Sequence, residues 1–110
     1  MSGPTPVLEQ LCEDWEVEPG SARRIVLRGR ALAVFNVGGS FHVTDDTCTH
    51  GFASLAEGTL EGHVVTCPWH GGAFDVRSGA PVAAPCTEAL AVHPCRAREG
   101  AIWVELPAPD

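Results

Sequence analysis

The sequence predicts an all-β fold made of small antiparallel sheets, arranged as a sandwich or a partial barrel. Short apolar runs, punctuated by turn residues, recur along most of the chain. Twelve glycines and nine prolines among 110 residues favour short strands and tight loops. Helix signals are weak, and only Ser54 to Glu57, with Ser54 as the N-cap, is expected to form a single helical turn.

Each expected strand is an apolar run that ends at a turn signal. Gly38-Gly39 separates two such runs and is a hairpin signal, whereas Pro68 marks the point where the chain leaves a sheet. The last two strands are expected to form a hairpin around Arg98 to Gly100. In chain order the strands are Arg24 to Leu27, Ala31 to Val37, Phe41 to Thr44, His63 to Thr66, Ala73 to Val76, Leu90 to Cys95 and Ala101 to Leu106, with further turns at Gly29-Arg30 and Arg77 to Gly79.

Length and hydropathy indicate a single-domain protein without a membrane-spanning segment. At 110 residues and 11.6 kDa we expect a single domain spanning residues 1–110. No apolar run is long enough to cross a membrane. The first fifteen residues lack the basic and apolar regions of a secretory signal, so we expect a cytoplasmic protein.

The charge balance indicates which kinds of partner the chain can bind. The formal net charge is −7, from 14 acidic residues against 7 basic ones, and this repels phosphate backbones. Nucleic acid is therefore excluded, and a basic protein partner fits better. The first twenty residues hold five acidic residues and no basic one, which is consistent with a solvated face or with a docking patch.

The cysteines and histidines form two pairs. Five cysteines cannot all be joined in disulfides, and cytosolic thiols stay reduced, so cysteines beside histidines are first read as metal ligands. The pairs are Cys48-x-His50 and Cys67-x2-His70, and a glycine follows each histidine. A zinc ion also accepts two thiolates and two imidazoles, but a zinc finger places both histidines on a helix after the cysteine pair.

The two stretches CTHGF and CPWHGGAFD resemble the ligand loops of the Rieske 2Fe–2S family. The resemblance extends from about Ala22 to Leu106. It implies a Rieske-like fold in which loops of about residues 46–53 and 66–74 project from one end and bind one 2Fe–2S cluster. By this resemblance Cys48 and Cys67 hold the inner iron as thiolates, and His50 and His70 hold the outer iron.

The pattern is similar to the small ferredoxins of bacterial aromatic-ring-hydroxylating dioxygenase systems. That similarity implies an electron carrier, not an enzyme, which takes single electrons from a flavin-containing reductase to a terminal oxygenase and meets no small-molecule substrate. The loops lack the extra cysteine pair of respiratory Rieske proteins, and the segment Gly71 to Phe74 lacks the hydroxyl donors that those proteins place near the cluster. We therefore expect a reduction potential near the low end of the Rieske range, roughly −150 mV.

Three other interpretations remain open from the sequence. They are a Rieske-like small subunit of another reductase, such as a nitrite reductase, a structural Cys2His2 zinc protein, and a structural adaptor with an incidental cluster.

Trp69 and Phe52 are equally consistent with core packing and with an apolar docking rim. Trp103 is expected in the core, and Trp15 over an open end of a sheet. The remaining cysteines and histidines are expected to be structural, with Cys86 packed near the cluster but not ligating it; they are Cys12, Cys86, Cys95, His42, His63 and His93.

Overall fold

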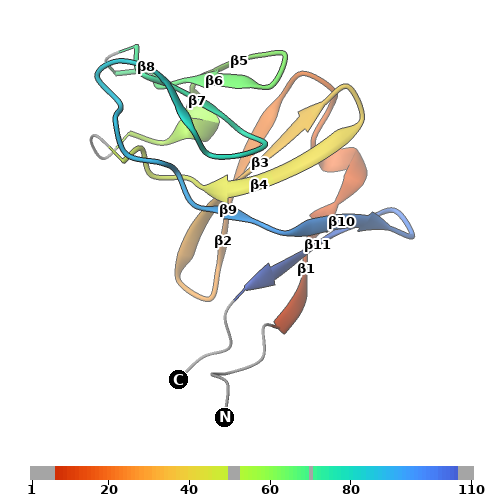
Figure 1. Cartoon of the computed structure of the whole chain (residues 1–110). Coiled ribbons are helices and arrows are strands. Elements are labelled where there is room, and N and C mark those ends of the chain that lie inside the picture. The colour runs from red at the N-terminus through yellow and green to blue at the C-terminus, as the bar shows by residue number, and fades with distance from the viewer. Residues whose placement is uncertain (1–6, 50–52, 70, 107–110) are drawn as a thin grey trace.

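The computed structural model of the chain describes residues 7–49, 53–69 and 71–106, and these residues form three small antiparallel sheets (Figure 1). Helix is limited there to two 3-10 turns, η1 (Asp14–Glu16) and η2 (Leu55–Glu57). The all-β prediction is confirmed. Within the same residues, no helix has the length and apolar character needed to cross a membrane.

The first sheet joins the two ends of the described chain. Its strand order is β1 (Val7–Glu13), β11 (Ala101–Leu106) and β10 (Cys95–Arg98), and Val7 pairs with Leu106. β1 was not predicted, because its two acidic residues interrupt the apolar pattern. Its partner β11 lies at the other end of the sequence, so only the tertiary fold supplies the pairing.

The second sheet is a meander extended by one short strand. Its order is β2 (Ala22–Leu27), β3 (Arg30–Val37), β4 (Ser40–Asp45) and β9 (Val92–His93). Successive side chains of a strand face opposite sides of a sheet. Leu32 and Val34 therefore enter one core and Ala33 and Phe35 the other, which explains why β3 reads as a continuous apolar run.

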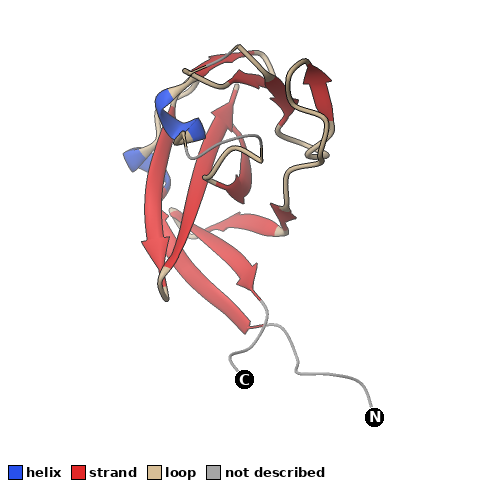
Figure 2. Ribbon diagram, turned by 90° about the vertical axis from the view of Figure 1, so that its left-hand side faces the viewer, coloured by secondary structure: helices blue, strands red, loops and turns tan. Residues whose placement is uncertain are grey.

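The third sheet has the order β5 (Thr59–Glu61), β6 (Val64–Thr66), β7 (Ala73–Asp75) and β8 (Pro81–Ala83). Figure 2 shows it at the end of the molecule away from the first sheet. β5 and β8 were not predicted, because β5 has one apolar residue between Thr59 and Glu61, and β8 begins at Pro81, which is a loop signal. The segments that precede β5 and β7 are the two cysteine loops.

Two hydrophobic cores lie on either side of the second sheet. The core toward the first sheet consists of Leu11, Cys12, Val17, Leu32, Val34, Val43, Ile102, Val104 and Leu106. The core toward the third sheet consists of Ala33, Phe35, Cys48, Ala53, Leu55, Val65, Cys67, Phe74, Val76, Cys86 and Leu90. Three cysteines thus belong to the second of these cores, at the end where the motif loops lie.

Several local predictions need correction. The first hairpin turn is Arg28-Gly29 and not Gly29-Arg30, since Leu27 pairs with Arg30. The strand expected from Leu90 to Cys95 is interrupted at Pro94, which has no N–H to donate; β9 pairs with β4, and β10 pairs with β11. The Gly38-Gly39 hairpin is confirmed.

The N-cap position of Ser54 is confirmed without its capping bond, and two predictions about tryptophans differ from the structure. Ser54 stands at the N-cap of η2, but its hydroxyl makes no capping bond and has no hydrogen-bond partner among the described residues. Trp15 is 75% exposed, which does not fit the expected packing over a sheet end. Trp103 is half-buried, because β11 turns Ile102 and Val104 to the core and Trp103 to the other face.

Candidate metal centre

The first cysteine loop begins as β4 ends and closes on itself before η2. Thr47 pairs with Ser54, and the Cys48 N–H donates to the Ala53 carbonyl at 3.0 Å. This closure places Cys48 in the core with only 2% of its surface exposed. His50, Gly51 and Phe52 lie outside the described residues, and the predictions about them are not tested.

A buried carboxylate fixes the base of this loop. Asp46 is 2% exposed, and its Oδ1 accepts the Ala56 N–H at 3.0 Å. Its Oδ2 lies 3.2 Å from Arg24 Nε on β2, and its backbone N–H donates to the Ala31 carbonyl of β3. One side chain therefore connects the loop to η2 and to the second sheet.

The second cysteine loop joins β6 to β7. The Cys67 N–H donates to the Gly72 carbonyl at 2.6 Å, and the Gly71 N–H donates back to the Cys67 carbonyl at 3.3 Å. Gly71 has a φ of 73°, the left-handed conformation that glycine adopts without strain. Cys67 is 2% exposed, whereas Trp69 is 68% exposed at the loop tip. Its neighbour His70 lies outside the described residues.

A third segment, which connects β8 to β9, contacts both cysteine loops. Its Cys86 is 4% exposed, and the Cys86 Sγ lies 3.7 Å from the Cys48 Sγ. A Cβ on Gly72 would collide with the Cys86 Sγ, so the second loop passes directly over this thiol. The hydroxyl of Thr49 in the first loop donates to the Glu88 carbonyl at 3.0 Å. The segment therefore holds the two loops together.

The environment of Cys86 keeps its thiol protonated. Burial is the largest cause that raises its pKa, followed by its hydrogen bond with Cys48 and by the nearby charges of Cys48 and Cys67. The resulting pKa is about 11. The sequence predicted that Cys86 packs near the site, but nothing in it indicated a direct contact with Cys48.

The two described cysteines of the motif suit an iron–sulfur cluster. Two buried thiols come from two loops that share one core, and thiolates are the ligands that such clusters require. The described residues, which leave out both motif histidines, contain no group of three or more His, Cys, Asp and Glu side chains arranged to hold a metal ion. Cys48 and Cys67, the part of the expected ligand set that the structure describes, therefore fit a 2Fe–2S cluster.

Two of the other candidates, His93 and Cys95, have structural partners. His93 is nearly buried, and its Nε2 lies 2.8 Å from Asp45 Oδ1. The Cys95 thiol donates to the Phe41 carbonyl at 3.3 Å. Burial raises the pKa of Cys12 to about 11, and burial lowers the pKa of His42. Arg24 and Asp46 were not predicted as residues of the site, because nothing in a run of two aspartates shows which one becomes buried.

Comparison with known proteins identifies the family. The model of the Rieske [2Fe–2S] domain matches residues 8–94. The chain belongs to the Rieske [2Fe–2S] family. The family implies a Rieske 2Fe–2S cluster as the cofactor, and the buried thiols of this Rieske chain are consistent with it. The zinc interpretation is therefore disfavoured.

Ferredoxins are among the proteins that are more than 40% identical to this chain. The chain is 49% identical to the ferredoxin CarAc of Metapseudomonas resinovorans, over 86% of this chain and 90% of that protein. It is 44% identical to the ferredoxin component of the p-cumate 2,3-dioxygenase system of Pseudomonas putida, over 89% of this chain and 85% of that protein. A solved complex of reduced oxygenase and oxidized ferredoxin in carbazole 1,9a-dioxygenase contains a chain that is 45% identical, with a TM-score of 0.86 and coverage of 92% of this chain and 94% of that chain. This Rieske chain is thus an electron-transfer ferredoxin and not a catalytic oxygenase.

Proposed function

We propose that the chain carries single electrons from a flavin-containing reductase to the terminal oxygenase of a multicomponent aromatic-ring-hydroxylating dioxygenase. The observation that carries this proposal is the pair of buried thiols, Cys48 and Cys67, on two loops that one segment holds together. Two relatives above 40% identity support it, the ferredoxin CarAc and the ferredoxin component of the p-cumate 2,3-dioxygenase system. The protein functions in the cytoplasm, as one Rieske domain spanning residues 1–110.

The ligand assignment follows the motif residue by residue. Cys48 and Cys67 hold the inner iron as thiolates, and His50 and His70 hold the outer iron through ring nitrogens. When bound, a 2Fe–2S cluster of this type supplies reversible one-electron chemistry. Because Cys48 and Cys67 are each 2% exposed, the core side of the site excludes bulk water.

The surroundings of the cysteines keep the ligand geometry fixed. Asp46 anchors the first loop, the Cys67–Gly72 hydrogen bond closes the second, and Thr49 connects the first loop to the segment that contains Cys86. Such supporting contacts limit movement of the ligands when the charge of the centre changes. The exposed Trp69 stands beside His70 in the sequence, where a partner reaches the outer side of the site.

The partners are two proteins that bind in turn. The solved carbazole 1,9a-dioxygenase complex, in which a chain 45% identical to this one is bound, supports a terminal oxygenase as one of them. A carrier must release each partner quickly, so a small, partly electrostatic interface is expected. With a net charge of −7, the chain is suited to partners that present basic surfaces.

The cofactor and its ligands can be tested together. Purified chain should contain two irons and two inorganic sulfides, and its reduced form should give a Rieske electron paramagnetic resonance spectrum. Cys67→Ser and His70→Ala should each abolish the visible spectrum, whereas Cys86→Ser should keep it. A folded chain that contains one zinc and no inorganic sulfide would overturn the proposal.

The function itself needs a second measurement. Reduced chain should be reoxidised by the terminal oxygenase of an aromatic dioxygenase system and reduced again by its reductase. A chain that carries the cluster but exchanges electrons with neither component, and serves a nitrite reductase instead, would show that the alternative of a reductase small subunit is correct.

A further inference from the structure

We propose that the Cys86 thiol donates a hydrogen bond to the sulfur of Cys48 and thereby raises the reduction potential of the centre. This inference rests on the proposed function, because it takes Cys48 as an iron ligand. Cys86 itself is not a ligand. Its role is to stabilise additional negative charge on the sulfur next to it.

The geometry places the two sulfur atoms in direct contact. The Cys48 Sγ and the Cys86 Sγ are 3.7 Å apart, within the reach of a hydrogen bond between sulfurs. The two residues are 2% and 4% exposed, so water does not compete for either sulfur. In such surroundings a hydrogen bond is electrostatically stronger than it is in water.

The position of Cys86 is fixed from two sides. Gly72 of the second loop leaves space for the thiol, because a Cβ there would collide with the Cys86 Sγ. On the other side, Thr49, the residue after Cys48, donates to the Glu88 carbonyl at 3.0 Å. The contact between the two thiols is therefore fixed by the second loop on one side and by the hydrogen bond between Thr49 and Glu88 on the other.

The direction of the effect follows from the roles of the two sulfurs. A ligating cysteine is deprotonated and can only accept, so the proton must come from the free thiol of Cys86. Reduction adds one negative charge to the centre, and a donor beside a ligand sulfur stabilises the reduced state more than the oxidised one. The segment from Gly71 to Phe74 contributes no hydroxyl, which makes the contribution of this thiol easier to detect.

Two substitutions separate hydrogen bonding from packing. Cys86→Ala removes the donor, and Cys86→Ser keeps one in a smaller side chain. We expect protein-film voltammetry to give a lower midpoint potential for Cys86→Ala than for the native chain. The potential of Cys86→Ser should lie clearly above that of Cys86→Ala. Cys95→Ala is the matched control, since it removes a thiol that donates to the Phe41 carbonyl instead, and it should leave the potential unchanged.

The iron and sulfide contents of the native chain and of the variants distinguish a failure of the proposed function from a failure of the inference about Cys86. If native chain lacks the cluster, the proposed function fails and this inference fails with it. If Cys86→Ala retains two irons and two sulfides and has the native potential, only the inference is overturned. Equal potentials for Cys86→Ala and Cys86→Ser would also overturn it, because the effect would then be one of packing. Loss of iron from both variants would contradict it as well, since Cys86 would then be needed to build the centre.

Discussion

Asp46 shows how one buried residue determines the shape of a ligand loop. Its carboxylate is 2% exposed and accepts the Ala56 N–H, while Arg24, with a side chain 53% exposed, balances its charge. A carboxylate buried to this degree is stable only when its oxygens are paired. The loop that contains Cys48 therefore depends on a residue that has no redox role of its own.

Replacing this residue should weaken the fold and the metal site together. We expect Asp46→Ala to lower the free energy of unfolding by about 1–3 kcal/mol, because it leaves the Ala56 N–H buried without an acceptor. Urea unfolding followed by circular dichroism gives this value, and iron analysis should show reduced loading. Arg23→Ala is the control, since Arg23 lies 3.6 Å from Glu16 with a side chain 52% exposed, and it should cost less than about 1 kcal/mol. Equal losses in the two variants would contradict the anchoring role of Asp46.

The interaction of Asp75 with Arg77 makes the free energy of unfolding depend on pH in the acid range. Three hydrogen bonds from Arg77, at 2.8, 2.9 and 3.2 Å, lower the pKa of Asp75 from 3.8 to about 2. A lowered pKa in the folded state means that this contribution is complete above pH 3.8 and is lost as the pH falls toward 2. The difference in unfolding free energy between native chain and Arg77→Ala should therefore shrink over this interval. Arg98→Ala, which removes an exposed charge on β10, should show no such change with pH.

Among the elements, β3 is the one that links the two cores. Its neighbours β2 and β4 are joined to it by two-residue turns, so the meander is built from local contacts. The sequence could predict these three strands because short apolar runs and glycine turns encode them directly. It could not predict β1, whose partner is β11, nor the change of sheet between β9 and β10.

The turn between β10 and β11 contains strain that can be removed. Glu99 has a φ of 53°, a conformation that disfavours residues with a Cβ but that asparagine tolerates. We expect Glu99→Asn to raise the free energy of unfolding by about 0.5–1 kcal/mol. Glu99→Gln removes the same charge without the preference for this conformation, so it should have a smaller effect. A thermal melt that ranks Gln at or above Asn would argue against the strain.

The cysteine half of the candidate site was predicted in part from the motif. Cys48 and Cys67 were expected in two loops at one end, and the structure buries both in one core. Their role as ligands, with His50 and His70, stays a prediction. The segment that contains Cys86 was harder to anticipate, because it meets the loops only through the fold and has no motif.

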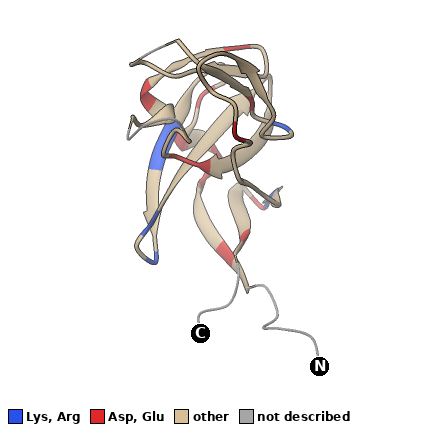
Figure 3. Cartoon of the chain, turned by 60° about the vertical axis from the view of Figure 1, so that its left-hand side comes forward, with Lys and Arg blue, Asp and Glu red and all other residues tan. Residues whose placement is uncertain are grey.

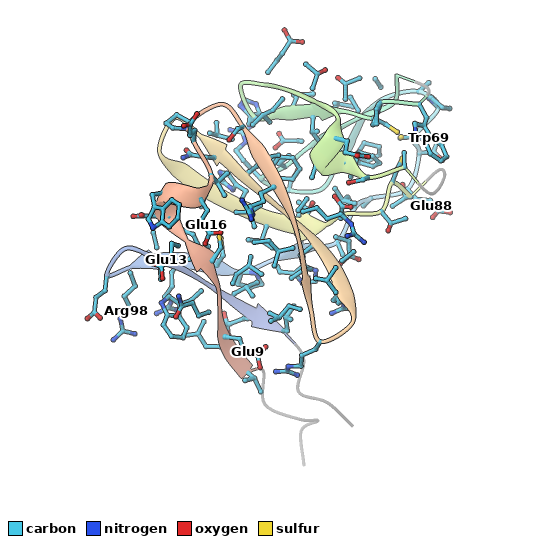
Figure 4. All side chains as sticks on the ribbon, turned by 180° about the vertical axis from the view of Figure 1, so that it is seen from behind. Glu9, Glu13, Glu16, Trp69, Glu88 and Arg98 are labelled. Carbon is cyan, nitrogen blue, oxygen red and sulfur yellow. The ribbon has the colours of Figure 1, made fainter. Side chains whose placement is uncertain are left out.

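For the whole molecule, charge and exposed apolar surface indicate where partners bind. Figure 3 shows acidic segments in several parts of the fold and few basic ones. In Figure 4, Trp69 and Glu88 lie at the same end of the molecule, while Glu13 and Glu16 of the η1 region lie on the other side. Trp69 is therefore the apolar residue best placed to meet a partner near the cysteine loops.

The two exposed tryptophans allow a matched test of this surface. Trp69→Ala should weaken binding to the terminal oxygenase about tenfold or more, because tryptophans near the centre of an interface contribute strongly, while the visible spectrum stays unchanged. Trp15→Ala, at a residue 75% exposed in η1, should leave binding unchanged. The test compares the affinities of the two variants for the oxygenase, measured by surface plasmon resonance at a fixed salt concentration. Equal effects of the two substitutions would mean that the oxygenase does not bind at the loop end.

The pairing of Val7 with Leu106 has a consequence for engineering the chain. Cross-strand partners in an antiparallel pair have Cα atoms only about 5 Å apart, so a few residues would suffice to connect these two positions. In Figure 1 the paired strands β1 and β11 lie at the lower end of the molecule, while the third sheet stands at the top. A tether to an electrode, or a fused reductase attached at this edge, would leave the opposite tip open for electron exchange.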